Sequence, residues 1–369
     1  MLRVCVQCGV ASCRGGSWRR GIGMDVREEG EPPQSWTYKA VGEFLEKDDG
    51  VEQSGAPRPR LMVLTSDKGW PYSWCVCVFN RDCHVNCEVD RVWRIVKGDL
   101  TAWLSIHGGT EFTPKRRLLV GTPGIGKSMN AGSYLLYQLL HCDAEKLQMV
   151  VHRFGNTTYV FDKTIQTVTS YTDKSMMIKA VKELSRRGMK GYIIYDVAKK
   201  GTPPASYFAS LREWGMIVVS SPEVSNYDGW ETEVKATRII MNCPEEMDVK
   251  AMCAWMKQGL DPDEQTKYWK MVEKHMEKVG PLPQHIFHAN DFKARFGAVE
   301  DALEAINSRY ADDRFILPGG RLWYSKDPSQ KLVRIVRARG EVGAEVFLNA
   351  PISVCLERRI PHHFWKRDE

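Results

Sequence analysis

The middle of the chain alternates between short, almost uninterrupted apolar runs and stretches with helical periodicity. Runs without polar alternation are typical of strands that are buried on both faces of a parallel sheet, and amphipathic stretches between them suit helical crossovers. We therefore predict an α/β domain over residues 111–244, with a five-stranded, mostly parallel sheet and helices on both faces. The five strands lie within residues 118–120, 147–154, 191–196, 215–221 and 237–241, and a hairpin is predicted over 157–168.

The regions before this domain show other patterns. Residues 1–56 have no sustained period of 2 or 3.6 and end in a linker rich in charge, glycine and proline, so we expect them to be largely disordered. Residues 57–110 predict a small α+β region with strands at 61–64 and 74–79. Apolar positions at helical spacing follow up to Leu104, and we expect this helix to pack on the central domain.

Helical signals dominate after residue 244. Asp261 at an N-cap position, Pro262 in the first turn and Gly280-Pro281 at the end mark one helix, with helical patterns before and after it. We expect residues 245–310 to form a helical subdomain that acts as a lid. Residues 311–369 predict a mixed C-terminal region.

The first predicted strand runs into a glycine-rich stretch that matches the Walker A pattern G-x-x-x-x-G-K-[ST]. Its glycines allow backbone conformations in which successive N–H groups cradle phosphates, and the helix that follows directs its partial positive charge at them. Lys127 is the candidate to reach the β- and γ-phosphates, and Ser128 the candidate to hold Mg²⁺. The predicted nucleotide-binding residues are Gly121, Thr122, Pro123, Gly124, Ile125, Gly126, Lys127, Ser128 and Met129.

A second stretch, Gly191 to Asp196, is an apolar run that ends in a carboxylate. A buried parallel strand ending in Asp suits a Walker B element, so we predict Asp196 and Ser128 as the Mg²⁺ site, and Asp196 with Lys127 as the catalytic groups. Ser220 or Ser221, at the end of the next strand, are candidates to lie beside the γ-phosphate. Because Val197 and not an acid follows Asp196, a group such as Glu223 would have to orient the attacking water, which predicts slow hydrolysis.

Composition narrows the class of protein further. With 52 Lys and Arg against 46 Asp and Glu, the chain carries a formal charge of +6, which permits nucleic-acid contact without demanding it. No apolar run approaches the roughly 18 residues of a membrane span, and the N-terminus lacks the apolar stretch of a signal peptide, so we expect an intracellular protein without a membrane partner.

Eleven cysteines are scattered along the chain, which indicates reduced thiols and not a disulfide framework. One group lies close together in the sequence and raises the alternative of a zinc site. We expect buried thiols instead, because two of these cysteines alternate on the predicted strand at 74–79. The group consists of Cys75, Cys77, Cys83, His84 and Cys87.

Four stretches resemble the retrotransposon hot spot proteins of trypanosomes: GTPGIGKS (121–128), GYIIYDVA (191–198), WGMIVVSSP (214–222) and VKAMCAW (249–255). The resemblance runs from about Pro57 to Arg359 and implies a P-loop protein with a nuclear or perinuclear location and a link to transcription and RNA handling. Residues 1–30 depart from the family pattern, and Gln284 stands where an arginine is expected in a sensor-like position. The resemblance also implies that the C-terminal region, 311–369, is truncated after Arg359.

The residues and the resemblance together predict a P-loop NTPase-like protein that uses ATP or GTP with Mg²⁺ and is located in the nucleus. A perinuclear or cytoplasmic location is the alternative. The alternative function is a non-catalytic nuclear protein, associated with other proteins or with nucleic acid, that binds nucleotide without efficient hydrolysis. A small-molecule kinase is the least favoured class, because no acceptor-site motif accompanies the P-loop.

Overall fold

The computed structural model describes residues 36–40, 60–66, 69–72, 82–105, 113–197, 203–211, 213–305, 321–323, 328–339 and 345–365. The strand predicted at 74–79, with Cys75 and Cys77, lies outside these residues, as do residues 1–35 and 41–59 of the N-terminal segment. No helix in the described part is both long and apolar enough to cross a membrane.

A seven-stranded sheet forms the centre of the molecule, and its five parallel strands are those expected from the apolar runs. The predicted hairpin is also present, but it extends the same sheet by two antiparallel strands, so the expectation of five strands was too low. In spatial order the strands are β10 (Thr237–Met241), β4 (Arg116–Gly121), β9 (Trp214–Ser220), β8 (Gly191–Asp196), β5 (Met149–Phe154), β6 (Thr157–Asp162) and β7 (Thr167–Tyr171).

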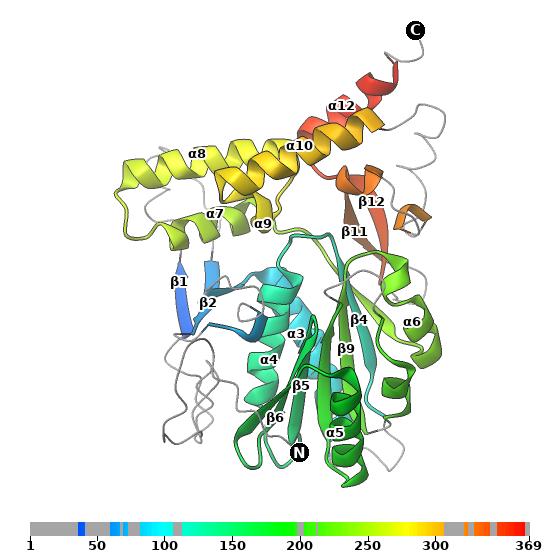
Figure 1. The fold of residues 1–369 in the computed structure, drawn as a ribbon. Coiled ribbons are helices and arrows are strands. Elements are labelled where there is room, and N and C mark those ends of the chain that lie inside the picture. The colour runs from blue at the N-terminus through cyan, green and yellow to red at the C-terminus, as the bar shows by residue number, and fades with distance from the viewer. Residues whose placement is uncertain are drawn as a thin grey trace.

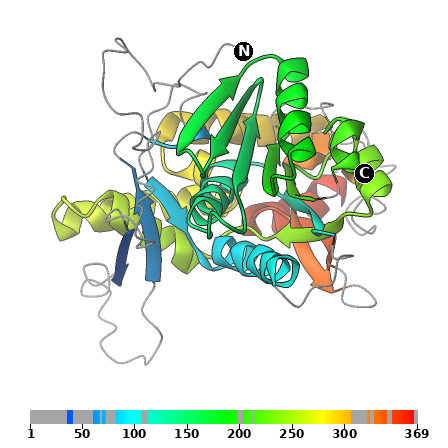
Figure 2. The ribbon, with the colours of Figure 1, turned by 90° about the horizontal axis from the view of Figure 1, so that it is seen from below.

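Helices cover both faces of this sheet, as Figure 2 shows from below. One face carries α3 (Cys87–Leu104) and α4 (Ser133–Leu140), and the other carries α5 (Lys174–Arg186), η2 (Ser206–Ser210) and α6 (Asp228–Val234). Along β4 the side chains alternate between the two cores: Leu119 belongs to the first, and Leu118 and Val120 to the second. All three are fully buried, which explains why the strand reads as an uninterrupted apolar run.

The packing of α3 confirms the helix expected before the central domain. Its Val92, Val96 and Leu100 are buried in the same core as α4 and β4. Before it lies a small antiparallel sheet of β1 (Trp36–Ala40), β2 (Arg60–Thr65) and β3 (Asp82–Val85). Strand β1 therefore lies within the segment that was expected to be largely disordered.

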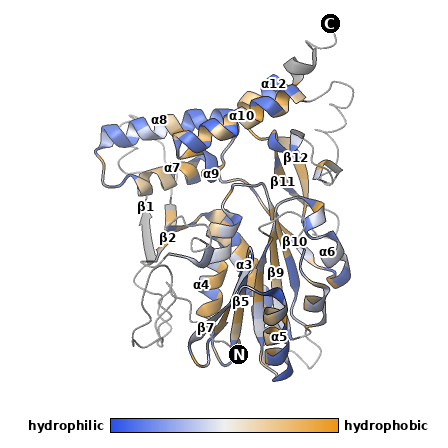
Figure 3. Ribbon diagram, viewed as in Figure 1, coloured by the Kyte–Doolittle hydropathy of each residue, from blue (hydrophilic) through white to orange (hydrophobic). Residues whose placement is uncertain are grey.

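A layer of helices lies above the carboxyl ends of the parallel strands (Figure 1). It consists of α7 (Glu246–Met256), α8 (Pro262–Val279), α9 (Pro283–Ile286) and α10 (Ala289–Ala305). The Asp261 carboxylate accepts a hydrogen bond from the Glu264 N–H at 2.9 Å, so the N-cap expected there is confirmed. The outer sides of α8 and α10 are largely hydrophilic (Figure 3).

The C-terminal region packs along the free edge of β10. It contains the hairpin of β11 (Val333–Arg339) and β12 (Glu345–Pro351), the short helices η5 (Arg321–Trp323) and η6 (Pro328–Lys331), and α12 (Val354–Trp365). The Glu345 carboxylate accepts from the Ile240 N–H at 2.6 Å, and the Arg337 N–H donates to the Asn242 side chain at 2.8 Å. The Glu345 side chain of the hairpin thus satisfies a backbone N–H that the edge strand β10 would otherwise expose.

Candidate functional site: the P-loop and its surroundings

The P-loop, residues 121–128, connects β4 to the helix that follows it, and glycine is required at its turns. Gly124 and Gly126 have φ values of +88° and +93°, which L-residues with a side chain rarely adopt. At Gly121 the reason is space, since a Cβ would lie 2.8 Å from the Ile125 side chain and 2.9 Å from that of Lys127. Ile125 itself is buried in the core and anchors the loop.

The helix after the loop begins with a wide π turn, η1 (Lys127–Gly132). The Gly126 carbonyl accepts from the N–H groups of both Asn130, at 2.7 Å, and Ala131, at 3.2 Å. The side chain of Asn130 accepts from the His84 N–H at 3.2 Å, and its carbonyl accepts from the Cys83 thiol at 3.3 Å. Strand β3 is therefore attached to the P-loop helix through Asn130, a residue that no sequence motif identified.

Lys127 folds back over the loop that carries it. Its ammonium donates to the carbonyls of Gly121 at 2.7 Å and Thr122 at 2.8 Å, and the residue is 8% exposed. Burial lowers the pKa of Lys127 to about 8, although the neighbouring Asp196 and Cys243 act in the opposite direction. A cation that is buried against two carbonyls at the base of a glycine loop is well placed to exchange those partners for phosphate oxygens.

Asp196, at the end of β8, lies beside the P-loop although the two belong to strands that are not neighbours. Strand β9 lies between β8 and β4, and the Ser128 and Lys127 side chains lie close enough to the Asp196 carboxylate to favour its charged form. Burial raises the pKa of Asp196 to about 6, against the effects of Ser128 and Lys127. Its Oδ2 is buried without a hydrogen-bond partner among the described residues. The structure thus brings together Lys127, Ser128 and Asp196, and the two oxygen ligands with a free carboxylate oxygen suit Mg²⁺.

The hydroxyls at the end of β9 are held in place by a residue that the sequence did not single out. Ser220 pairs with Val120 of β4 and so lies next to the start of the P-loop. The Asn226 amide donates to the hydroxyls of Ser220 at 3.3 Å and Ser221 at 3.1 Å. Glu223, the candidate for orienting water, is 6% exposed and accepts from the Ser225 hydroxyl at 3.2 Å. Its catalytic role stays a prediction.

The remaining predicted binding residues surround the loop in different ways. Thr122 is buried, and its hydroxyl accepts from the Ile335 N–H of β11 at 3.1 Å. Pro123 is exposed at the tip, and Met129 is half-buried against the core. The Gly124 carbonyl accepts from the Gln284 N–H of α9 at 3.2 Å. The helical layer and the C-terminal hairpin therefore both contact the loop directly.

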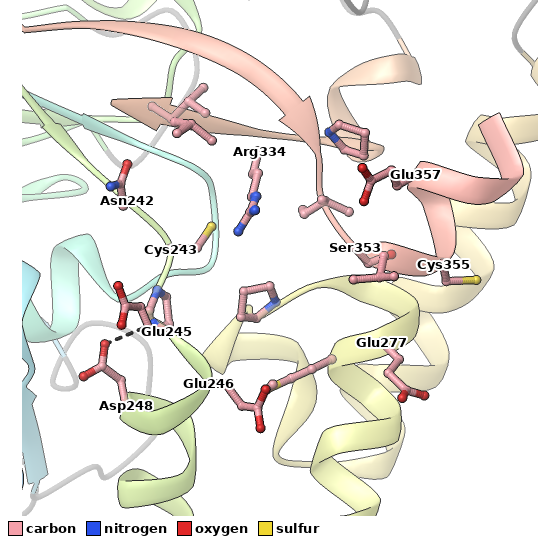
Figure 4. Close-up of a pocket in the computed structure, with 18 of the residues that line it drawn as sticks. Asn242, Cys243, Glu245, Glu246, Asp248, Glu277, Arg334, Ser353, Cys355 and Glu357 are labelled. Carbon is pink, nitrogen blue, oxygen red and sulfur yellow. Dashed lines mark hydrogen bonds between the residues drawn. The ribbon is translucent and has the colours of Figure 1, made fainter. Parts of the chain in front are cut away.

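A cleft of about 990 Å³ opens next to the P-loop, between the end of β10, the helical layer and the C-terminal region. Cys243 and Ile335 both line this cleft, and the Ile335 N–H donates to Thr122 of the loop. Burial raises the pKa of the Cys243 thiol. Arg334 projects into the cleft toward Cys243, with acidic side chains around the rim (Figure 4). Neither residue was predicted, because nothing in the local sequence relates them to the P-loop.

Comparison with solved structures returned similarities of low sequence identity. The ORC1 protein of Aeropyrum pernix, in complex with DNA, is 9% identical with a TM-score of 0.27, over 76% of this chain and 93% of that chain. The FIGL-1 AAA domain is 12% identical with a TM-score of 0.30, over 57% of this chain and 73% of that chain. A comparison with curated proteins gave no match.

Comparison with protein families is decisive. Residues 118–365 match the model of the retrotransposon hot spot protein P-loop domain, and residues 11–115 match the model of the N-terminal region of the same proteins. The two matches together cover most of the chain, and the first includes the P-loop helix, Asp196 and the helical layer. The chain belongs to the retrotransposon hot spot protein family and carries that family's P-loop domain.

Proposed function

We propose that the protein binds a nucleoside triphosphate, ATP or GTP, together with Mg²⁺ at the P-loop, and that it hydrolyses the nucleotide slowly. The observation that carries this proposal is the convergence of Lys127, Ser128 and Asp196 from two non-adjacent strands. These are the types of group that neutralise phosphate charge and hold the metal in phosphoryl transfer.

Each of these residues has a defined part in this proposal. Lys127 exchanges its two carbonyl partners for phosphate oxygens, and Ser128 and Asp196 supply oxygen ligands to Mg²⁺, which would neutralise charge on the phosphates. The residue after Asp196 is Val197, so no carboxylate follows the metal ligand directly in the sequence to orient water. Slow turnover follows from that arrangement, and Glu223 is the candidate to supply the missing group.

Thermal unfolding with and without nucleotide tests the proposal. A ligand at about a hundred times its dissociation constant stabilises the native state by roughly 2.7 kcal/mol, which raises Tm by several degrees. Lys127→Ala should lose this shift and the Mg²⁺-dependent turnover. Lys163→Ala is a matched control, because Lys163 is also a partly buried lysine that donates to two backbone carbonyls, those of Leu139 and Cys142. An equal rise in Tm for the parent and Lys127→Ala would place the nucleotide elsewhere. No rise in either protein would mean that the nucleotide does not bind.

A second function, contact with nucleic acid, is favoured by a specific feature of α8. Four exposed lysines, spaced three or four residues apart, follow one side of the helix. Successive lysines are therefore separated by about 4.5 to 6 Å along the helix axis. They line a groove of about 450 Å³ together with His275 and Phe292, whose rings stack at 3.8 Å. A basic groove beside aromatic rings suits a single strand of nucleic acid. The lysines are Lys267, Lys270, Lys274 and Lys278.

The salt dependence of oligonucleotide binding tests this second function. The logarithm of the binding constant falls linearly with the logarithm of the salt concentration, and each phosphate contact with a single strand contributes about 0.7 to the steepness of this slope. Replacing Lys270, Lys274 and Lys278 by Ala should therefore reduce the steepness by about 2. The same number of charges removed from α5 and its C-terminal side, at Lys174, Lys179 and Lys190, provides the control. Equal losses in both variants would assign the effect to net charge and not to the groove.

We also propose a nuclear location, on the basis of the family. Imaging of the tagged full-length protein checks it, and a signal confined to the cytoplasm would contradict it.

A further inference from the structure

The short helix α9 lies against the tip of the P-loop. Besides the backbone hydrogen bond from Gln284 to the Gly124 carbonyl, two polar side chains reach the same point. A Cβ on Gly124 would lie 3.3 to 3.4 Å from the His285 ring and 3.4 Å from the Gln284 Oε1. The helical layer thus places an imidazole and an amide at the loop that is shaped for phosphate.

The position of α9 is fixed by its surroundings. Leu282 and Ile286 are fully buried, and the Ile286 carbonyl hydrogen-bonds to the His275 ring at 2.8 Å. The chain enters the segment through Gly280, whose φ is +84°. The backbone at His285 is therefore held against the loop by buried residues on both sides of it in the sequence.

An unpaired cation lies near this contact. Arg295, in α10, donates from Nη2 to the Lys331 carbonyl at 2.8 Å, but its Nε is buried with no hydrogen-bond partner among the described residues. No carboxylate forms an ion pair with it in the described part of the chain. Burial lowers the pKa of His285, Arg295 lowers it further and Asp291 opposes, so the two side chains are electrostatic neighbours.

A half-buried arginine with an unused donor is costly unless an anion satisfies it in some state of the protein. We propose that His285 and Arg295 form a second half of the nucleotide site, and that they bind phosphate oxygens of a nucleotide in the P-loop from the side of the helical layer. This inference rests on nucleotide binding at the P-loop, proposed above. It assigns to His285 and Arg295 the contact with nucleotide that the family resemblance led us to expect from an arginine at the position of Gln284.

The proposal makes the helical layer a part of the binding site. A nucleotide held between Lys127 below and His285 with Arg295 above connects the P-loop to α9 and α10. Hydrogen bonds to a charged phosphate are worth more than neutral ones, so losing either side chain should accelerate nucleotide release by about tenfold.

Stopped-flow release of a fluorescent ATP or GTP analogue from the full-length protein tests the proposal. His285→Ala and Arg295→Gln should each release the triphosphate about tenfold faster. The matched controls are His288→Ala and Lys293→Ala, which remove exposed side chains of the same chemistry from the same segment and should stay within about twofold of the parent. Apo Tm values close to that of the parent establish that each variant is folded.

His285→Phe separates a polar contact from simple packing, because it keeps a ring against Gly124 and removes both nitrogens. Release as fast as in His285→Ala supports the proposal, and release at the parental rate overturns it for His285. Parental release in Arg295→Gln overturns it for Arg295. If the parent binds no nucleotide, with Lys127→Ala indistinguishable from it, the proposed function itself fails and this inference fails with it.

Discussion

The Thr122 hydroxyl of the P-loop accepts a hydrogen bond from the Ile335 N–H at 3.1 Å, across 213 residues of sequence. Both residues are almost fully buried. The contact means that the second residue of the loop is also the anchor for the C-terminal hairpin, so the described C-terminal region is part of the same structural unit as the nucleotide site.

Thr122→Val keeps the shape of the side chain and removes the acceptor. The Ile335 N–H would remain buried without its partner, so the free energy of unfolding should fall by about 1 to 3 kcal/mol. Urea denaturation measures this loss. Thr237→Val, at the exposed start of β10, is the control and should change stability by less than about 0.5 kcal/mol. A similar loss in the free energy of unfolding for the two variants would mean that the Thr122 hydrogen bond does not stabilise the protein.

Asp196→Asn should stabilise the nucleotide-free protein at neutral pH. The pKa of Asp196 is raised by burial from 3.8 to about 6, so the folded state retains a proton between these values and the group's contribution to stability declines as pH rises through 6. The variant should therefore match the parent near pH 4 and exceed it at pH 7 in urea denaturation. It should also lose Mg²⁺-dependent turnover, because Asn has no charge to offer the metal.

Asp173→Asn provides a contrast of opposite sign. The Asp173 carboxylate is the exposed N-cap of α5, and its pKa is lowered by hydrogen bonds from the Ser175 hydroxyl and the Met176 N–H. Any stability difference for that variant should be a loss that is complete above the unfolded pKa and disappears as the pH falls through the folded pKa. A parallel response of the two variants would contradict the assignment of Asp196 as a carboxylate with a raised pKa.

Gly280→Ala should destabilise the protein strongly. A Cβ there would lie only 2.3 Å from the Ile352 carbonyl oxygen, and the φ of +84° disfavours any L side chain, so we expect a loss of about 2 to 4 kcal/mol. Gly297→Ala, in the middle of α10 with open space around it, should instead stabilise by up to about 1 kcal/mol. Thermal unfolding of the pair distinguishes a positional requirement at Gly280 from a general effect of glycine.

Glu88→Gln should weaken the attachment of the C-terminal hairpin. The Glu88 carboxylate accepts from Arg337 at 2.8 Å, from Arg91 at 3.2 Å and from the Asn242 N–H at 3.0 Å. Burial alone raises the pKa of Glu88, but these hydrogen bonds outweigh it and the pKa is lowered. The stabilisation is therefore present above the unfolded pKa and declines as the pH falls through the folded one.

At pH 7 we expect Glu88→Gln to cost about 1 to 3 kcal/mol, and the difference from the parent should shrink in acid. The control is Glu300→Gln, which removes a carboxylate from a more exposed pair with Arg359. Surface pairs contribute less than about 1 kcal/mol, so that variant should change little. A pH-independent cost of Glu88→Gln would point to packing and not to charge.

Local sequence determined much of this structure. The five apolar runs became the five parallel strands because a strand covered on both faces has no polar position to fill, and Leu118, Leu119 and Val120 show this directly. The P-loop was identifiable because Gly124 and Gly126 adopt backbone conformations that other residues avoid. The start of α8 was identifiable because Asp261 caps it through a contact only three residues away. Each of these signals acts within a few residues of chain.

Tertiary structure alone decided the arrangements that join distant segments. Periodicity indicates which faces of a strand are buried but not which neighbour pairs with it, so neither the position of β9 between β4 and β8 nor the addition of β6 and β7 to the sheet could be predicted. Asn130, Asn226 and Arg295 carry no local signal, because their partners are set by how separate elements pack. The same holds for His285 at Gly124 and Ile335 at Thr122: the sequence supplied the phosphate-binding loop, and the folding of two later segments onto it decided what surrounds it.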